Sequence, residues 1–153
     1  MNKSPDSESP GTVAILIDLL RFFKASAAEQ VETLAHYDQV CAEKGAPHLH
    51  DPLIELTEAL YTYCGAAVSA PHHPDSFFVG PLPKEAVRLM QELSALAETL
   101  LTSNLQILFS RDVLDRQEWQ YVRALANAGL NQLADLAIQT PLSLFDLMCY
   151  VAD

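Results

Sequence analysis

The sequence predicts an all-α fold, a compact bundle of six or seven helices, and three observations support this prediction. Every strong hydrophobic periodicity along the chain is helical, and no stretch alternates convincingly as a β-strand. Start and stop signals of helices separate these periodic segments. Half of the 153 residues are hydrophobic and 19% are charged, which is ordinary for a globular domain with one core. We therefore expect a single domain over residues 12–153, preceded by a flexible polar tail at residues 1–11.

Two helices are expected first, at residues 12–24 and 26–44. In the first of them Asp18 and Arg21 share one narrow face and apolar side chains fill the rest, which is typical of a helix in the middle of a bundle. The second begins with the capping box Ser26-Ala27-Ala28-Glu29, in which each polar side chain bonds the backbone of the other residue. Gly45 is the expected stop of this helix.

Two further helices are expected at residues 52–64, with a possible extension to 69, and at residues 83–109. Asp51 and Pro52 have the residue types of an N-cap and a first helical position. Pro83 opens the other helix, which carries an apolar stripe made by Met90, Leu93, Ala97, Leu100 and Ile107. The loop 70–83 between them contains four prolines, and loops of this length in a compact domain tend to be functional or disordered.

The last helices are expected at residues 115–128, 131–139 and 141–152. Asp115 with Glu118 reads as a second capping box, and Gly129 reads as the end of the helix that follows. Thr140 caps the C-terminal helix, which is apolar almost to its end. We expect that helix to dock either onto its own bundle or across a dimer axis.

The charge of the chain restricts its partners. Nine Lys and Arg against 20 Asp and Glu give a formal net charge of −11. Such a field repels phosphate backbones and anionic lipid headgroups, so we expect neither nucleic acid nor a membrane surface as a partner. A basic protein surface would be attracted. The most apolar stretch, residues 13–23, carries two charges and is shorter than the roughly 20 residues that span a bilayer.

The cysteines indicate a reducing compartment. Cys41, Cys64 and Cys149 are odd in number and far apart, and no C-x-x-C motif is present. This pattern is neither a disulfide framework nor a zinc knuckle. We expect three buried thiols in a cytoplasmic protein.

The histidines suggest one possible site. Four of the five lie in two proline-framed loops, and imidazole with carboxylate is a natural ligand set for zinc, iron or manganese. The candidate ligands are His48, His50, Asp51, His72, His73 and Asp75. A helix of about 18–25 Å separates the two loops, at 1.5 Å per residue, so they converge only if the longer loop folds back. Solvated loop histidines, with Asp51 as a helix cap, are the simpler interpretation.

A hydrophobic loop suggests a second site, which would bind a protein partner. Phe77 and Phe78 lie among the prolines of the loop 70–83, where they either tuck onto the core or anchor a partner. The acidic side chains that would attract a basic partner are Glu29, Glu32, Glu43, Glu55 and Glu58.

The sequence leaves two alternative roles for each of two polar features. Asp38 falls at the centre of the apolar face of the second helix, so we expect a buried carboxylate with a structural partner, or else a functional role. Arg116 and Arg123 lie on one stripe of the fifth helix with Gln120 and Asn127. Such a stripe is usually a solvated surface, but two arginines on one face could also hold a carboxylate or phosphate.

No phosphate loop, nucleophile elbow or other catalytic motif is present. The leading hypothesis is therefore a non-enzymatic helical module, such as an inhibitor, an immunity-type protein or an adaptor, without a cofactor. In this hypothesis the module binds a basic protein through acidic residues and a hydrophobic loop. The first alternative is a metal-dependent, hydrolase-like enzyme that uses the His/Asp loops. The second is a subunit of a larger assembly that self-associates through its C-terminal helix.

Overall fold

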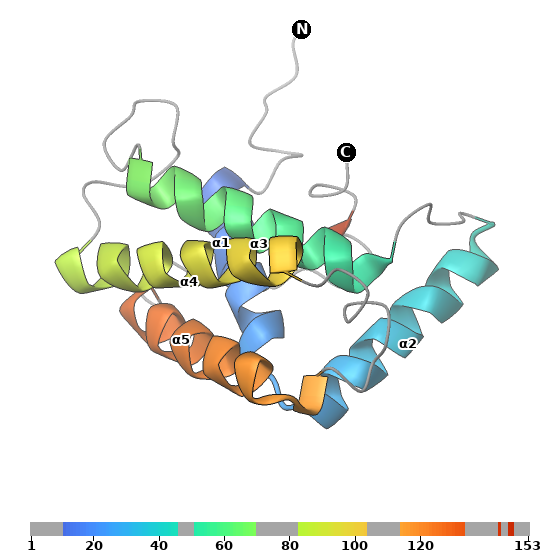
Figure 1. Ribbon diagram of the computed structural model, residues 1–153. Helices are drawn as coiled ribbons and strands as arrows, with labels where there is room; N and C mark the ends of the chain where they lie inside the picture. Colours follow the sequence, from blue (N-terminus) through green and yellow to red (C-terminus); the bar gives the residue numbers. More distant parts are fainter. Residues whose placement is uncertain are drawn as a thin grey trace, which may run out of the picture.

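The structure, a computed structural model, describes residues 11–45, 51–69, 83–103, 114–133, 144 and 147–148. Within these ranges the chain contains no strand, and its helices are α1 (Gly11–Lys24), α2 (Ala27–Glu43), α3 (Pro52–Ser69), α4 (Lys84–Ser103) and α5 (Gln117–Leu133). The all-α class is confirmed (Figure 1). The expected number of six or seven helices is not reached in the described ranges, partly because α5 runs through a position where the sequence suggested a break.

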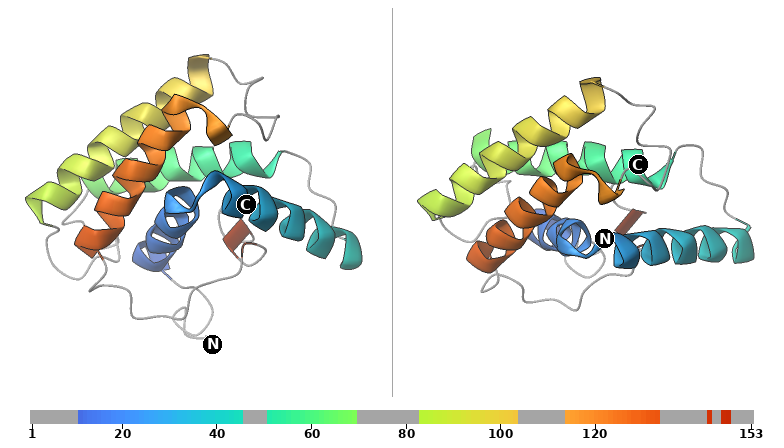
Figure 2. Two further views of the ribbon diagram at one scale, coloured as in Figure 1. Left: turned by 90° about the horizontal axis from the view of Figure 1, so that it is seen from below. Right: turned by 60° about the horizontal axis from the view of Figure 1, so that its bottom comes forward.

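Helix α1 lies at the centre of the bundle, as its nearly all-apolar surface predicts. It packs on α5 and on α3, while α4 packs on both α3 and α5 (Figure 2). Leu16, Leu19, Leu20 and Phe23 on α1 are fully buried. The ring of Phe23 stacks on the buried Trp119 of α5, with ring centroids 6.0 Å apart and planes inclined by 10°. The first helix therefore supplies apolar surface to several neighbours at once.

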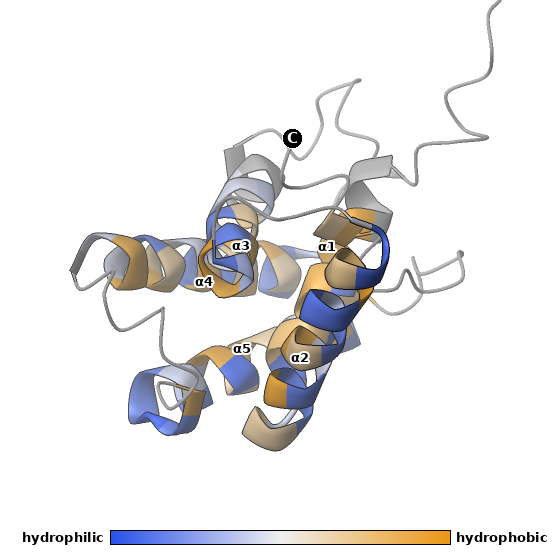
Figure 3. Ribbon diagram, turned by 90° about the vertical axis from the view of Figure 1, so that its right-hand side faces the viewer, coloured by the Kyte–Doolittle hydropathy of each residue, from blue (hydrophilic) through white to orange (hydrophobic). Residues whose placement is uncertain are grey.

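The predicted limits of α2 are confirmed. Ser26 is its N-cap, and both bonds of the capping box with Glu29 are present. Gly45 ends the helix with a φ of 62°, a left-handed conformation that L side chains rarely adopt. Figure 1 shows α2 extending away from the other helices, and Figure 3 shows hydrophilic residues recurring along it.

The buried side of α2 differs from the prediction. Its buried residues are Gln30, Leu34, Tyr37 and Cys41, whereas Asp38 is exposed. The expected burial of Asp38 was wrong, because the apolar face of α2 is too weakly defined in the sequence to fix which side meets the core. The exposed carboxylate carries no desolvation penalty of the kind that we expected.

The cap of α3 is also confirmed. The side chain of Asp51 accepts a hydrogen bond from the backbone N–H of Leu53 at 2.8 Å, and the helix extends to the later of its two expected ends, Ser69. Pro83 directly precedes α4, and its carbonyl accepts a bond from the N–H of Val87 at 3.1 Å. On the predicted α4 stripe Met90, Leu93 and Ala97 are buried and Leu100 is half-buried, while Ile107 lies outside the described residues.

Helix α5 does not end before Gly129, as the sequence had suggested, but continues to Leu133. Gly129 is buried where α5 meets α4, and a Cβ atom at this position would stand 2.6 Å from Cε of Met90. The glycine thus serves close packing between two helices. At the other end, the carbonyl of Arg116 accepts the first helical bonds, from the N–H groups of Trp119 and Gln120 at 3.1 Å each.

The C-terminal segment contributes to the chain's own core. Leu147 and Met148 are 2% and 4% exposed, and Leu144 packs against the core. The rest of the two expected helices after Leu133 lies outside the described residues. Along the described helices, none combines the length and the hydrophobicity that crossing a membrane requires.

Candidate functional site

The hydrophobic loop and most of the candidate metal ligands lie outside the described residues. These residues are Phe77 and Phe78, together with His48, His50, His72, His73 and Asp75. Asp51, the one candidate ligand that the structure describes, caps α3. In the described ranges no three His, Cys, Asp or Glu side chains form a group that could hold a metal ion. Elemental analysis of the purified chain tests the metal hypothesis directly.

The predicted acidic residues lie on two helices without cations. Neither α2 nor α3 contains a Lys or Arg. Glu29, Glu32 and Glu43 on α2 are exposed, and on α3 Glu58 is exposed while Glu55 is half-buried. With Asp38 and the cap Asp51, residues 26–45 and 51–69 carry seven carboxylates against the single cation of Lys44. We call this part of the molecule the acidic helices.

One of these carboxylates has a local structural role. Oε1 of Glu29 accepts a bond from the backbone N–H of Ser26 at 3.1 Å, and the N–H of Glu29 donates to the Ser26 hydroxyl at the same distance. The bond with the backbone of Ser26, followed by the bond with its side chain, lowers the pKa of Glu29 below its usual value. Glu29 is therefore both a helix cap and a permanent negative charge at neutral pH.

Helices α4 and α5 have a different charge pattern. Over residues 83–103 and 114–133 there are four cations and five carboxylates, so the charges nearly cancel. Arg88 on α4 makes ion pairs with Glu85 and Glu92, and the hydrogen bond to Glu85 raises the pKa of its guanidinium further above its usual value. Nε of Arg116, the residue directly before α5, lies 3.5 Å from Oε1 of Glu118. Charge is thus uneven along the chain: α2 and α3 are strongly acidic, whereas α4, which packs on α3, and α5 are nearly neutral.

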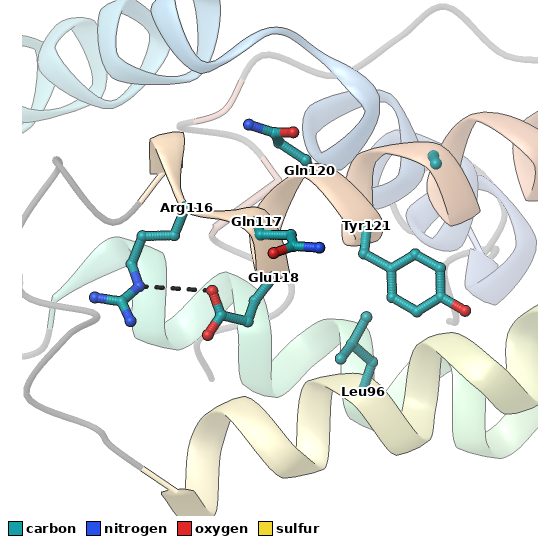
Figure 4. Close-up of a pocket in the computed structure, with 7 residues that line it drawn as sticks. Leu96, Arg116, Gln117, Glu118, Gln120 and Tyr121 are labelled. Carbon is teal, nitrogen blue, oxygen red and sulfur yellow. Dashed lines mark ion pairs between the residues drawn. The ribbon is translucent and has the colours of Figure 1, made fainter.

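An open groove of about 930 Å³ lies on this second side, where the start of α5 meets α4. It is lined by Leu96, Arg116, Gln117, Glu118, Gln120, Tyr121 and Ala124. Figure 4 shows the side chains of Tyr121 and Leu96 beside each other, with the Arg116–Glu118 pair toward the other end. Tyr121 is 55% exposed, the highest value among the large hydrophobic side chains of the described residues.

Sequence reasoning missed this groove, although a sign of it was present. The buried residues of α5 include Trp119, Val122, Leu125 and Ala126, which define one helical face. Tyr121 falls outside that face, so a large aromatic side chain had to point away from the core. Leu96 is half-buried at the edge of the apolar stripe of α4, and only the packing of the two helices places it beside Tyr121.

Arg123, one of the two arginines on the predicted stripe, has a structural role. Its Nε donates to the carbonyl of Ala25 at 2.9 Å, its Nη2 donates to Oε1 of Gln30 at 2.7 Å, and Nη2 also bonds the carbonyl of Leu114. Desolvation by burial lowers its pKa from the usual arginine value. Arg116 and Arg123 therefore do not form the ligand-binding pair that the sequence allowed. Arg116 is exposed and lines the groove, whereas the half-buried Arg123 bonds the chain's own polar groups.

Gln30 completes this polar junction. The side chain is fully buried, and its Nε2 donates to the carbonyls of Phe22 at 2.9 Å and Phe23 at 3.3 Å, at the C-terminal end of α1. The carbonyls at the end of a helix have no partner within the helix, so amide and guanidinium donors from α2 and α5 satisfy them. The positive charge of Arg123 also suits the negative end of the α1 dipole.

Comparison with known proteins gives no functional assignment. No family model matches the chain, and no curated protein and no solved structure shows significant similarity to it.

Proposed function

We propose that this chain is a non-enzymatic protein-binding module, of the kind found in inhibitors, immunity-type proteins and adaptors, whose partner is a basic protein. The observation that carries the proposal is the uneven distribution of charge. The acidic helices present exposed carboxylates with almost no cation among them, while Arg88 and Arg116 each lie within ion-pair distance of a nearby carboxylate.

The mechanism follows from this arrangement. Carboxylates on two neighbouring stretches of the chain add up to a local negative potential, which raises the rate of encounter with a positively charged surface. The exposed Glu32, Glu43 and Glu58 bear this role. Glu43 also accepts a bond from Nε2 of Gln39 at 3.3 Å, and Glu29 combines this role with the capping of α2. Phe77 and Phe78 in the loop 70–83 supply the apolar anchor that is buried after the encounter.

The first experiment identifies the partner and tests the steering together. The tag-free chain is immobilised and exposed to a native cell extract at low and high salt, in parallel with a variant carrying Glu32→Gln, Glu43→Gln and Glu58→Gln. A specific basic protein is expected to bind the wild-type chain. With that protein purified, the association rate should fall in the variant and with rising salt, because screening weakens the long-range attraction.

A matched control separates charge position from charge number. The same number of neutralised glutamates on the other side, Glu85→Gln, Glu92→Gln and Glu98→Gln, should reduce the association rate less. Equal effects of both triple variants would argue against the acidic helices as the docking side.

The anchor has its own test. Phe77→Ala with Phe78→Ala should leave a folded chain that dissociates faster from the partner. A variant that unfolds would instead assign the two rings to the core, and the anchor part of the proposal would fail.

A further inference from the structure

The groove between α4 and α5 exposes apolar surface on a rigid support. Trp119 and Val122 on either side of Tyr121 are each 1% exposed, so the helix cannot rotate to bury the tyrosine without exposing them. Leu96 comes from α4, which is held against α5 by close packing at Gly129. The aromatic ring and the leucine therefore form a fixed apolar surface that faces solvent (Figure 4).

Charged residues of both signs surround this surface. Arg116 and Glu118 belong to the groove itself. Toward the start of α4, Arg88 pairs with Glu92 and lies within electrostatic range of Tyr121. A surface with both signs at both ends is complementary to itself. In a two-fold arrangement, each end of one copy meets an end of the other copy that offers a carboxylate for its arginine and an arginine for its carboxylate.

Long-range charge decides which face a second copy can approach. Two chains that each carry a net charge of −11 repel one another. The repulsion is greatest between the acidic helices, and it is least where cations and carboxylates nearly cancel, over α4 and α5. A basic partner has the opposite preference. The two faces are thus suited to different partners.

We propose that the groove lined by Leu96, Tyr121 and Ala124 is the surface through which two copies of this chain form a reversible, two-fold dimer. Tyr121 lies near the axis, and the paired charges of Arg116, Glu118, Arg88 and Glu92 lie around it. This surface differs from the C-terminal segment, whose Leu147 and Met148 are already buried within the chain.

The size of the surface predicts a weak dimer. Helices of 20 and 17 residues, at 1.5 Å per residue and about 10 Å wide, offer a footprint of roughly 25 by 20 Å, or about 500 Å². Standard stable interfaces bury about 800 Å² per partner. We therefore expect a dissociation constant in or above the micromolar range, with exchange between monomer and dimer.

The test is sedimentation equilibrium of the full chain over a wide concentration range, at 0.1 M and 1 M NaCl. Salt shortens the screening length from about 10 Å to about 3 Å, so the mutual repulsion of two acidic chains weakens. Dimerisation is expected to become stronger at the higher salt concentration. Binding of a basic protein to the acidic helices becomes weaker under the same change, so the two proposals fail or succeed independently.

Substitution localises the surface. Tyr121→Ser should weaken dimerisation by at least about tenfold, as expected for an aromatic residue at the centre of an interface. Tyr61→Ser is the matched control, because Tyr61 is an exposed tyrosine on α3 with 40% of its surface accessible; it should leave the dissociation constant within about twofold. Circular dichroism verifies that both variants are folded.

Three results would overturn the proposal. The first is a wild-type chain that remains monomeric at every concentration in 1 M NaCl. The second is a dimer that persists unchanged in the Tyr121→Ser variant. The third is a Tyr61→Ser variant that loses the dimer as completely as Tyr121→Ser.

Discussion

Replacing Gln30 by leucine tests the polar junction that ties the end of α1 to α2 and α5. Gln30 is fully buried and makes three side-chain bonds: to the carbonyls of Phe22 and Phe23, and from the guanidinium of Arg123. Leucine has a similar volume and fits a buried site, but it makes none of these bonds. The perturbation therefore removes hydrogen bonds while leaving little empty space.

The magnitude follows from the partners that remain. The carbonyl of Phe22 keeps a bond from the N–H of Ala25 at 3.2 Å, and Arg123 keeps its bonds to the carbonyls of Ala25 and Leu114. The carbonyl of Phe23 loses its side-chain donor. Each lost neutral bond costs about 1 kcal/mol and the one to the charged guanidinium about 2 kcal/mol, partly offset by the apolar burial of leucine. We expect the free energy of unfolding to fall by about 2–4 kcal/mol.

Urea titration measures this change. Trp119 is the single tryptophan of the chain and is buried against Phe23, so its fluorescence reports the unfolding of this region. The control is Gln39→Leu, a change of the same type on the same helix at an exposed position, which should alter the free energy by less than about 0.5 kcal/mol. If Gln30→Leu were no more destabilising than Gln39→Leu, the junction would not contribute to stability and the reasoning would be refuted.

Three other expectations concern pH, packing and thiol reactivity. The capping box lowers the pKa of Glu29, so its stabilising contribution is present above the usual glutamate pKa of 4.5 and is lost as the pH falls through the lowered native value. Glu29→Gln should therefore lower the melting temperature at pH 7 but not in strong acid, whereas Glu32→Gln should change little at either pH; a difference that persists in strong acid would contradict this. Gly129→Val should destabilise the chain by about 1–3 kcal/mol in urea titrations through overpacking, while Gly65→Ala, whose new Cβ would make only an ordinary contact at 3.5 Å, should be neutral or stabilising by up to about 1 kcal/mol. Burial raises the pKa of the Cys64 thiol, so a thiol-specific reagent followed by peptide mass spectrometry should label it only after denaturation; labelling of the native chain would show that the site opens.

The caps and stop signals of the helices were predictable from the sequence. The capping box at Ser26, the stop at Gly45 and the cap at Asp51 all appear where they were expected. Each depends on bonds or backbone angles within a few residues of the chain, so neighbouring residue types are enough to specify them. The central place of α1 was predictable for a related reason, since a helix that is apolar on nearly every side has to be covered on nearly every side.

Residues whose role depends on distant partners were not predictable in the same way. Gly129 has the residue type of a helix stop, but the approach of Met90 from α4 makes it a packing position. Arg123 shares a helical stripe with Arg116, yet its bonds to Ala25 and Gln30 span 98 and 93 residues of sequence. Asp38 was assigned to the wrong side of α2 because the periodicity of that helix alone does not fix which side the rest of the chain covers.

The sequence by itself therefore determined the helical class, most helix ends and the excess of negative charge, because these follow from composition and from interactions between near neighbours. The tertiary structure decided which polar side chains are brought together and where apolar surface remains exposed. The groove at Leu96 and Tyr121 exists only because α4 and α5 pack together, and Arg123 joins Gln30 and the end of α1, rather than Arg116, only because these segments meet in the fold. Both are properties of contacts between segments far apart in the chain, which the hydrophobic pattern of a single helix does not encode.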